Sequence, residues 1–182
     1  MADVSDDVAR AACLGNRDAL SHVYASLAPK VLGYLRAHGV EDPDGLTNEV
    51  FLQVIPRLSR LTGGSAGLRT FVFSVAHARV VDEVRRRARR PRESPYEVDD
   101  DQRTGPSAET EALAHADAPQ VVSLLARLSE EQRNVVALRI LGDLGVEETA
   151  RILDRSTGSV KQLQRRALVT MRTLMEREEV AL

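Results

Sequence analysis

The chain has 182 residues, enough for one medium domain or two small ones, and its 43% of hydrophobic residues excludes wholesale disorder. Aromatic residues make up only 3% and Trp is absent, so the core must consist of Leu, Val, Ile and Ala, a set that suits helices better than sheets. The net charge of −2 hides a separation of charge along the chain. Residues 79–92 contain seven Arg against two acids, residues 93–117 contain eight acids against one Arg, and residues 151–172 contain six Arg or Lys against one acid. Two basic segments around an acidic one indicate anionic partners.

Several classes of site are not expected. The single cysteine, Cys13, can form no intramolecular disulfide and indicates a reducing, cytoplasmic setting. The acidic N-terminus does not resemble a signal peptide, and no run approaches the ~18 apolar residues of a membrane span. The four His lack metal-ligand spacing, and the glycine-rich segment TGGSAG lacks the Lys and strand of a phosphate-binding loop. We therefore expect no metal, cofactor, small-molecule substrate, catalytic residue or enzymatic activity.

The first half of the chain predicts helices in sequence. Apolar residues recur at spacings of three, four and seven between residues 6 and 38, with a break at Gly15-Asn16, where Asn16 can cap the second helix, and a stop at Gly39. A turn is expected at residues 41–45. Residues 46–61 then predict a helix that Pro56 should kink or end early. Residues 62–67 predict a loop, and residues 68–90 a long helix with an apolar first half and an Arg-rich end.

The second half begins with a segment of different composition. Residues 91–117 combine prolines and acids without a sustained period, which indicates a flexible acidic linker. Residues 119–141 predict two helices that break at Leu128-Ser129, where Ser129 and Gln132 match a capping box, and residues 146–154 a short helix after a turn. The predicted fold is all-α. Two small helical domains, residues 1–91 and 119–182, would be joined by the linker at 92–118.

Residues 146–165 meet the requirements of a helix-turn-helix. Ala150 is the small residue needed where two helices cross, Asp154 tolerates the unusual backbone angles of the turn, and an inner face is available for burial. That inner face consists of Val160, Leu163 and Ala167. The start of the second helix offers short polar and basic groups to base edges and phosphates, namely Ser156, Thr157, Ser159, Lys161, Gln162, Arg165 and Arg166. A plain helical hairpin would satisfy the same spacing.

Three segments in order extend this interpretation: GLTNEVFLQVIPRL, LRTFVFSVAHARVVDEVRRRAR and LARLSEEQRNVVALRILGDLGVEETARILDRSTGSVKQLQRRAL. Together they resemble a bacterial RNA polymerase sigma factor of the extracytoplasmic-function (ECF) type, sigma-70 family, over nearly the whole chain. The resemblance implies a subunit that binds core RNA polymerase and directs promoter recognition and opening for transcription initiation. Its implied partners are core RNA polymerase (the β′ clamp helices and the β flap), promoter DNA and an anti-sigma factor.

The resemblance also implies roles by position. The first segment would dock on the clamp helices through Asp42, Asp44, Leu46, Thr47, Glu49, Val50 and Phe51. The loop at residues 62–67 and the helix after it would meet the −10 element, where a base is flipped out, through Arg69, Phe71, Ala78, Arg79, Arg85, Arg86 and Arg87. The linker would thread toward the RNA exit path. Residues 156–166 would read the −35 element in the major groove.

The chain departs from the family pattern at positions that keep other functions open. Gly45 stands where an acidic residue is usual, Ala78 where Asn is frequent, and Phe71 where Trp is usual. One alternative is a free-standing helix-turn-helix regulator with an autonomous operator. The other is a decoy that binds polymerase without opening promoters.

Overall fold

The computed structural model describes residues 4–89 and 118–179, and within these ranges the chain contains helices and no strand. The all-α class predicted from the sequence is therefore confirmed. The predicted linker falls, apart from residue 118, outside the described residues. The elements in chain order are α1 (Asp6–Cys13), α2 (Arg17–Ala37), α3 (Pro43–Val54), the 3-10 helix η1 (Ile55–Arg60), α4 (Gly64–Arg89), α6 (Ala118–Ala126), α7 (Glu130–Ile140), α8 (Val146–Leu153) and α9 (Thr157–Glu179).

Local capping signals placed several helix ends correctly. Asn16 Oδ1 accepts a hydrogen bond from the backbone N–H of Ala19 at 2.9 Å and so caps α2. Ser129 Oγ accepts from the N–H of Gln132 at 3.5 Å at the start of α7. The early end expected near Pro56 is also confirmed, because α3 stops at Val54 and continues as η1.

Two expected boundaries are wrong. The turn predicted at residues 41–45 ends at Asp42, whose side chain accepts from the N–H of Gly45 at 2.8 Å and caps a helix that starts at Pro43. The loop predicted at residues 62–67 is shorter than expected, because α4 begins at Gly64. The reason lies outside the local sequence: the Asp6 carboxylate of α1 accepts a hydrogen bond from the N–H of Ser65 at 2.8 Å.

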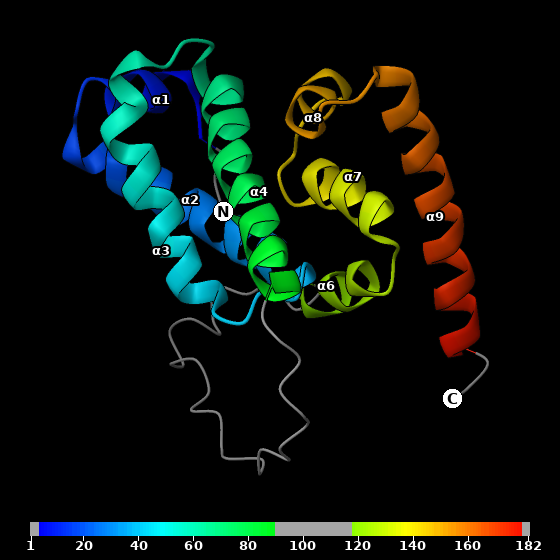
Figure 1. The fold of residues 1–182 in the computed structure, drawn as a ribbon. Coiled ribbons are helices and arrows are strands. Elements are labelled where there is room, and N and C mark those ends of the chain that lie inside the picture. Colours follow the sequence, from blue (N-terminus) through cyan, green and yellow to red (C-terminus); the bar gives the residue numbers. More distant parts are fainter. Residues whose placement is uncertain (1–3, 90–117, 180–182) are drawn as a thin grey trace.

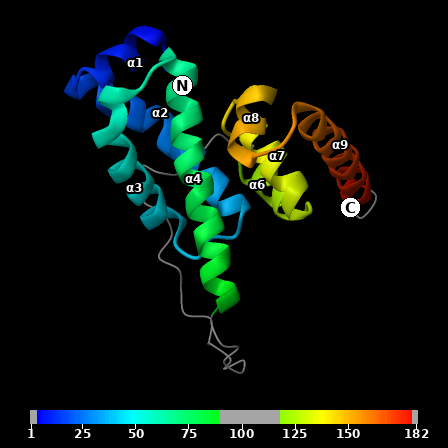
Figure 2. The ribbon, with the colours of Figure 1, turned by 45° about the horizontal axis from the view of Figure 1, so that its top comes forward.

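The helices gather into two groups. Figure 1 shows α1–α4 on one side and α6–α9 on the other, with α4 along the boundary, and Figure 2 keeps this division in a second orientation. Helix α2 contacts α6 and α7, and α4 contacts α8. One cluster of buried apolar residues runs through both groups and includes Tyr34, Phe73 and Leu138. The two groups therefore share a hydrophobic core in this structure.

Polar contacts also cross the boundary. His38 Nε2 lies 2.7 Å from the side-chain amide oxygen of Asn134 on α7. Arg69 of α4 and Asp143, in the turn between α7 and α8, form an ion pair at 3.6 Å. These contacts fix the position of the second group, α6–α9, which contains the predicted helix-turn-helix, against α2 and α4.

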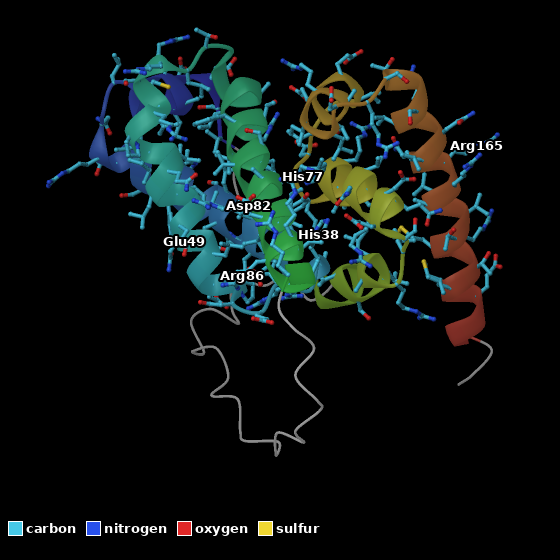
Figure 3. All side chains as sticks on the ribbon, viewed as in Figure 1. His38, Glu49, His77, Asp82, Arg86 and Arg165 are labelled. Atoms are coloured by element: carbon cyan, nitrogen blue, oxygen red, sulfur yellow. The ribbon has the colours of Figure 1, made fainter. Side chains whose placement is uncertain are left out.

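The stability of the chain is expected to depend on pH because of His77, a half-buried histidine beside this boundary. The hydroxyl of Tyr34, whose pKa burial raises, forms a hydrogen bond with Nδ1 of His77 at 2.9 Å; Figure 3 shows His77 on α4. Burial lowers the pKa of His77 to about 4. Because an unfolded histidine titrates near pH 6.5, the unfolded chain binds the additional proton between these values. The free energy of unfolding should therefore fall as pH drops from about 6.5 to about 4, by up to about 3 kcal/mol.

Urea unfolding across this pH range would measure the effect. His77→Gln should make the profile less steep without removing it, because burial also lowers the pKa of His38; His22→Gln, at an exposed position, is the control substitution. An equally steep profile in the His77 variant would show that other groups cause the dependence.

Candidate nucleic-acid and polymerase interfaces

Helices α8 and α9 form the predicted helix-turn-helix. Asp154, between them, adopts the left-handed conformation with φ 50° and ψ 51°, as its position in the turn required. Val160 is fully buried, and Leu163 packs with it against Val135 of α7 and Ala150 of α8. The inner face expected for the second helix is therefore confirmed, and it fixes which side of α9 faces outward.

The outward side of α9 carries the residues predicted to read the −35 element. Lys161, Gln162, Arg165 and Arg166 are exposed and fall within an arc of about 140° on a helix with 3.6 residues per turn. Figure 3 shows Arg165 pointing away from α7. Ser156 and Thr157 are exposed at the start of the helix and Ser159 is half-buried. The structure thus brings six of the seven predicted residues to the N-terminal half of α9, and Ser156 directly precedes that helix.

The orientation of α9 depends on a residue that the sequence interpretation missed. Arg139 of α7 donates from Nε to the side-chain oxygen of Gln164 at 3.3 Å, and its guanidinium also donates to the carbonyl oxygen of Leu144. The side chain of Arg139 therefore links α7 to both α9 and the turn before α8. The available signal was an arginine within the otherwise apolar segment VVALRIL.

The residues predicted to meet the −10 element do not share one face of α4. Phe71, Ala78 and Arg85 are seven residues apart, so they lie along one side of the helix. Arg69 lies about 200° from Phe71 around the helix axis. Its side chain is only 15% exposed and pairs with Asp143 of the helix-turn-helix group.

Three further arginines of this set are engaged by acids. Arg86 pairs with Glu83 at 2.6 Å, and Arg87 contacts both Glu83 at 3.2 Å and Glu41 at 3.6 Å. Arg79 lies 3.9 Å from Asp82. The hydrogen bond from Arg86 lowers the pKa of Glu83. A phosphate that approaches this end of α4 therefore has to compete with carboxylates for the guanidinium groups.

Helix α3 divides the predicted polymerase-binding set by burial. Thr47, Val50 and Phe51 face the core, where the Phe51 ring packs edge-to-face on Tyr24 with ring centroids 4.8 Å apart. Leu46 is half-buried and packs against the same core, whereas the exposed members are Asp42, Asp44 and Glu49. The buried residues can support this helix but present no surface to a partner.

Sequence reasoning missed one apolar residue on this helix. Leu52 is 73% exposed, although it lies between the buried positions of α3. A leucine where the helical period places a solvent-facing residue was the signal that could have found it.

A cleft of about 360 Å³ lies between the first half of α3 and the second half of α4, and it is lined by charged residues of both signs. It is lined by Val40, Glu41, Asp42, Leu46, Glu49, Arg79, Asp82, Glu83 and Arg86; Figure 3 shows Glu49, Asp82 and Arg86 in this region. In the part of the chain that the structure describes, no three His, Cys, Asp or Glu residues are grouped to hold a metal ion. None of the described helices is long and apolar enough to cross a membrane.

Comparison with known proteins identifies relatives of both halves. Residues 124–173 match the family model "Sigma-70, region 4". The ECF RNA polymerase sigma factor ShbA of Streptomyces griseus is 34% identical, with 87% of this chain and 86% of that protein covered. The ECF RNA polymerase sigma factor SigD of Mycobacterium tuberculosis is 31% identical, with 90% of this chain and 80% of that protein covered. The ECF RNA polymerase sigma factor BldN of Streptomyces coelicolor is 28% identical, with 88% of this chain and 62% of that protein covered. Among solved structures, CnrH in complex with the cytosolic domain of CnrY shares the fold, with a TM-score of 0.63 and 20% identity over 96% of this chain and 99% of that one.

Proposed function

Because the chain belongs to the ECF sigma factors of the sigma-70 family and directs promoter-specific transcription initiation, we propose that three of its surfaces divide this task. Helix α9 reads the −35 element, α4 and the loop before it meet the −10 element, and α3 docks on core RNA polymerase. The chain divides accordingly into an N-terminal domain at residues 1–91, a linker at 92–118 and a C-terminal domain at 119–182. It opens the duplex through binding energy that favours the melted strand and catalyses no reaction itself.

Helix α9 is the observation that carries the proposal. Its buried residues fix an outward face that holds Lys161, Gln162, Arg165 and Arg166, and the positive end of the helix dipole at its start favours phosphate. Such contacts make affinity depend steeply on salt. About six phosphate contacts would lose on the order of 10³ in affinity between 50 and 200 mM salt.

Contact of α4 with DNA is coupled to the position of the helix-turn-helix group. In this structure the guanidinium of Arg69 forms an ion pair with the carboxylate of Asp143. A phosphate can replace this carboxylate only when the turn between α7 and α8 moves away from α4. The row of Phe71, Ala78 and Arg85 needs no such movement; Ala78 and Arg85 are exposed, and Phe71 is half-buried. Initial contact with the −10 element therefore falls to this row.

Leu52 provides a test of polymerase docking by α3. Leu52→Ser should weaken binding to core RNA polymerase by about tenfold or more, the loss typical of an apolar residue at the centre of an interface. Leu14→Ser is the matched control, because Leu14 is 83% exposed but lies in the turn between α1 and α2. Binding of labelled variants to immobilised core polymerase would measure both. Equal losses in the two variants, or none in either, would contradict docking through this face of α3.

Run-off transcription with core polymerase and a library of random upstream sequences tests the proposal as a whole. Transcripts that share two upstream elements spaced as −35 and −10 would support it. Polymerase binding without enriched start sites would identify a decoy, and no polymerase binding a free-standing regulator. An anti-sigma factor is a further proposed partner, supported by family membership and by the complex of CnrH with the cytosolic domain of CnrY.

A further inference from the structure

The start of α4 lacks a capping side chain of its own. The two residues around the helix start are Gly63 and Gly64, so neither can satisfy the N–H groups of the first turn. The acceptor comes instead from α1: Asp6 Oδ1 lies 2.8 Å from the backbone nitrogen of Ser65, 59 residues further along the chain. Hydrogen bonds from the Ser65 backbone and side chain hold the pKa of Asp6 below its usual value.

The backbone around this cap is adapted to the carboxylate. Gly64 has φ +60°, and a Cβ atom there would lie 2.5 Å from Asp6 Oδ1. Only glycine allows both this conformation and this close approach. Asp6 is not the N-cap of its own helix α1, because that position is Ser5, whose side chain accepts the hydrogen bond from the N–H of Val8.

The inner side of the loop borders a cleft. A cleft of about 360 Å³ lies between α1 and the loop, lined by Asp6, Ala9, Arg10, Cys13, Leu61, Gly63 and Gly64. Asp6, Gly63 and Gly64 all line this cleft, and the hydrogen bond between Asp6 and Ser65 ties the start of α4 to α1.

We propose that Asp6 is a positioning residue for recognition of the −10 element: from α1, its carboxylate fixes the conformation in which residues 62–64 and the first turn of α4 meet the promoter. This inference rests on the proposed role of that loop. Asp6 itself touches no DNA in this proposal. Its effect passes through Ser65 and Gly64, which makes −10 reading depend on the N-terminal helix.

The test uses the full chain with core polymerase and two libraries, one randomised at the −10 element and one at the −35 element. Asp6→Ala should reduce discrimination among −10 sequences by roughly three- to tenfold, the effect of one lost hydrogen bond, and leave −35 discrimination as in the parent. Asp6→Asn keeps the oxygen acceptor and should restore most of the discrimination. Asp7→Ala removes the neighbouring exposed carboxylate, which pairs only locally with Arg10, and should have no such effect.

Loss confined to −10 selection with rescue by Asn separates positioning from general destabilisation, which would lower transcription from all sequences alike. Unchanged −10 selection in Asp6→Ala, or the same loss in the Asn variant, would overturn the inference. Thr62→Ala in the otherwise unchanged chain tests the loop itself. If the parent shows −10 preferences that Thr62→Ala alters and Asp6→Ala does not, only the role of Asp6 fails. If −10 selection is absent in the parent, the proposed function of the loop fails, and the role of Asp6 fails with it.

Discussion

Replacing Arg165 with Ala is expected to relax selection at one position of the −35 element by about 1–3 kcal/mol, or roughly five- to 150-fold between the preferred and other bases. Arg165 is exposed on the outward face of α9, and its guanidinium can donate two hydrogen bonds to a guanine edge in the major groove. Gln162 lies on the same face and is expected to behave alike at a neighbouring base pair. Sequencing transcripts from a library randomised at the −35 element measures the preference at each position.

Lys161→Ala is the comparison that separates base reading from phosphate contact. A lysine on phosphate contributes nearly equally to all sequences, so its loss should lower transcription uniformly and reduce the salt dependence of binding by about one phosphate contact. Uniform losses in Arg165→Ala and Gln162→Ala as well would show that α9 positions the protein on DNA without reading its sequence.

Gly67→Ala is expected to destabilise the chain by about 1–3 kcal/mol, the usual cost of overpacking. Gly67 lies in the first turn of α4, and a Cβ atom there would overlap the carbonyl oxygen of Thr62. The loop cannot simply move aside, because the N–H of Gly67 donates to the carbonyl oxygen of Gly63 at 2.9 Å. Since the same loop is proposed to meet the −10 element, selection at that element should weaken together with stability.

Gly158→Ala is the matched control for this substitution. Gly158 is also in the first turn of a long helix, α9, but the nearest atom to an added Cβ is Ser156 Oγ at 3.9 Å. Alanine there should be neutral or stabilise the chain by about 0.5–1 kcal/mol through its helix propensity. Thermal unfolding of both variants measures whether each substitution lowers or raises the stability of the chain. A Gly67 variant as stable as the parent would mean that the loop has room to relax.

Features that depend on near neighbours in the chain could be predicted before the fold was known. The period of Val160, Leu163 and Ala167 gave the inner face of α9, and Asn16 gave the start of α2, because helical faces and side-chain caps join residues three or four positions apart. The ordered family-like segments supported the function for the same reason: they are continuous stretches of sequence.

Contacts between distant segments determine which members of a predicted site are available to a partner. Val50 and Phe51 are buried and Leu52 is exposed because α2, through Tyr24, covers one side of α3. Arg69 is only 15% exposed and forms an ion pair with Asp143, which lies in a distant turn. The start of α4 is set by Asp6 across 59 residues. Each of these outcomes depends on which distant segments meet in the folded chain, and no period or motif within one segment specifies that pairing.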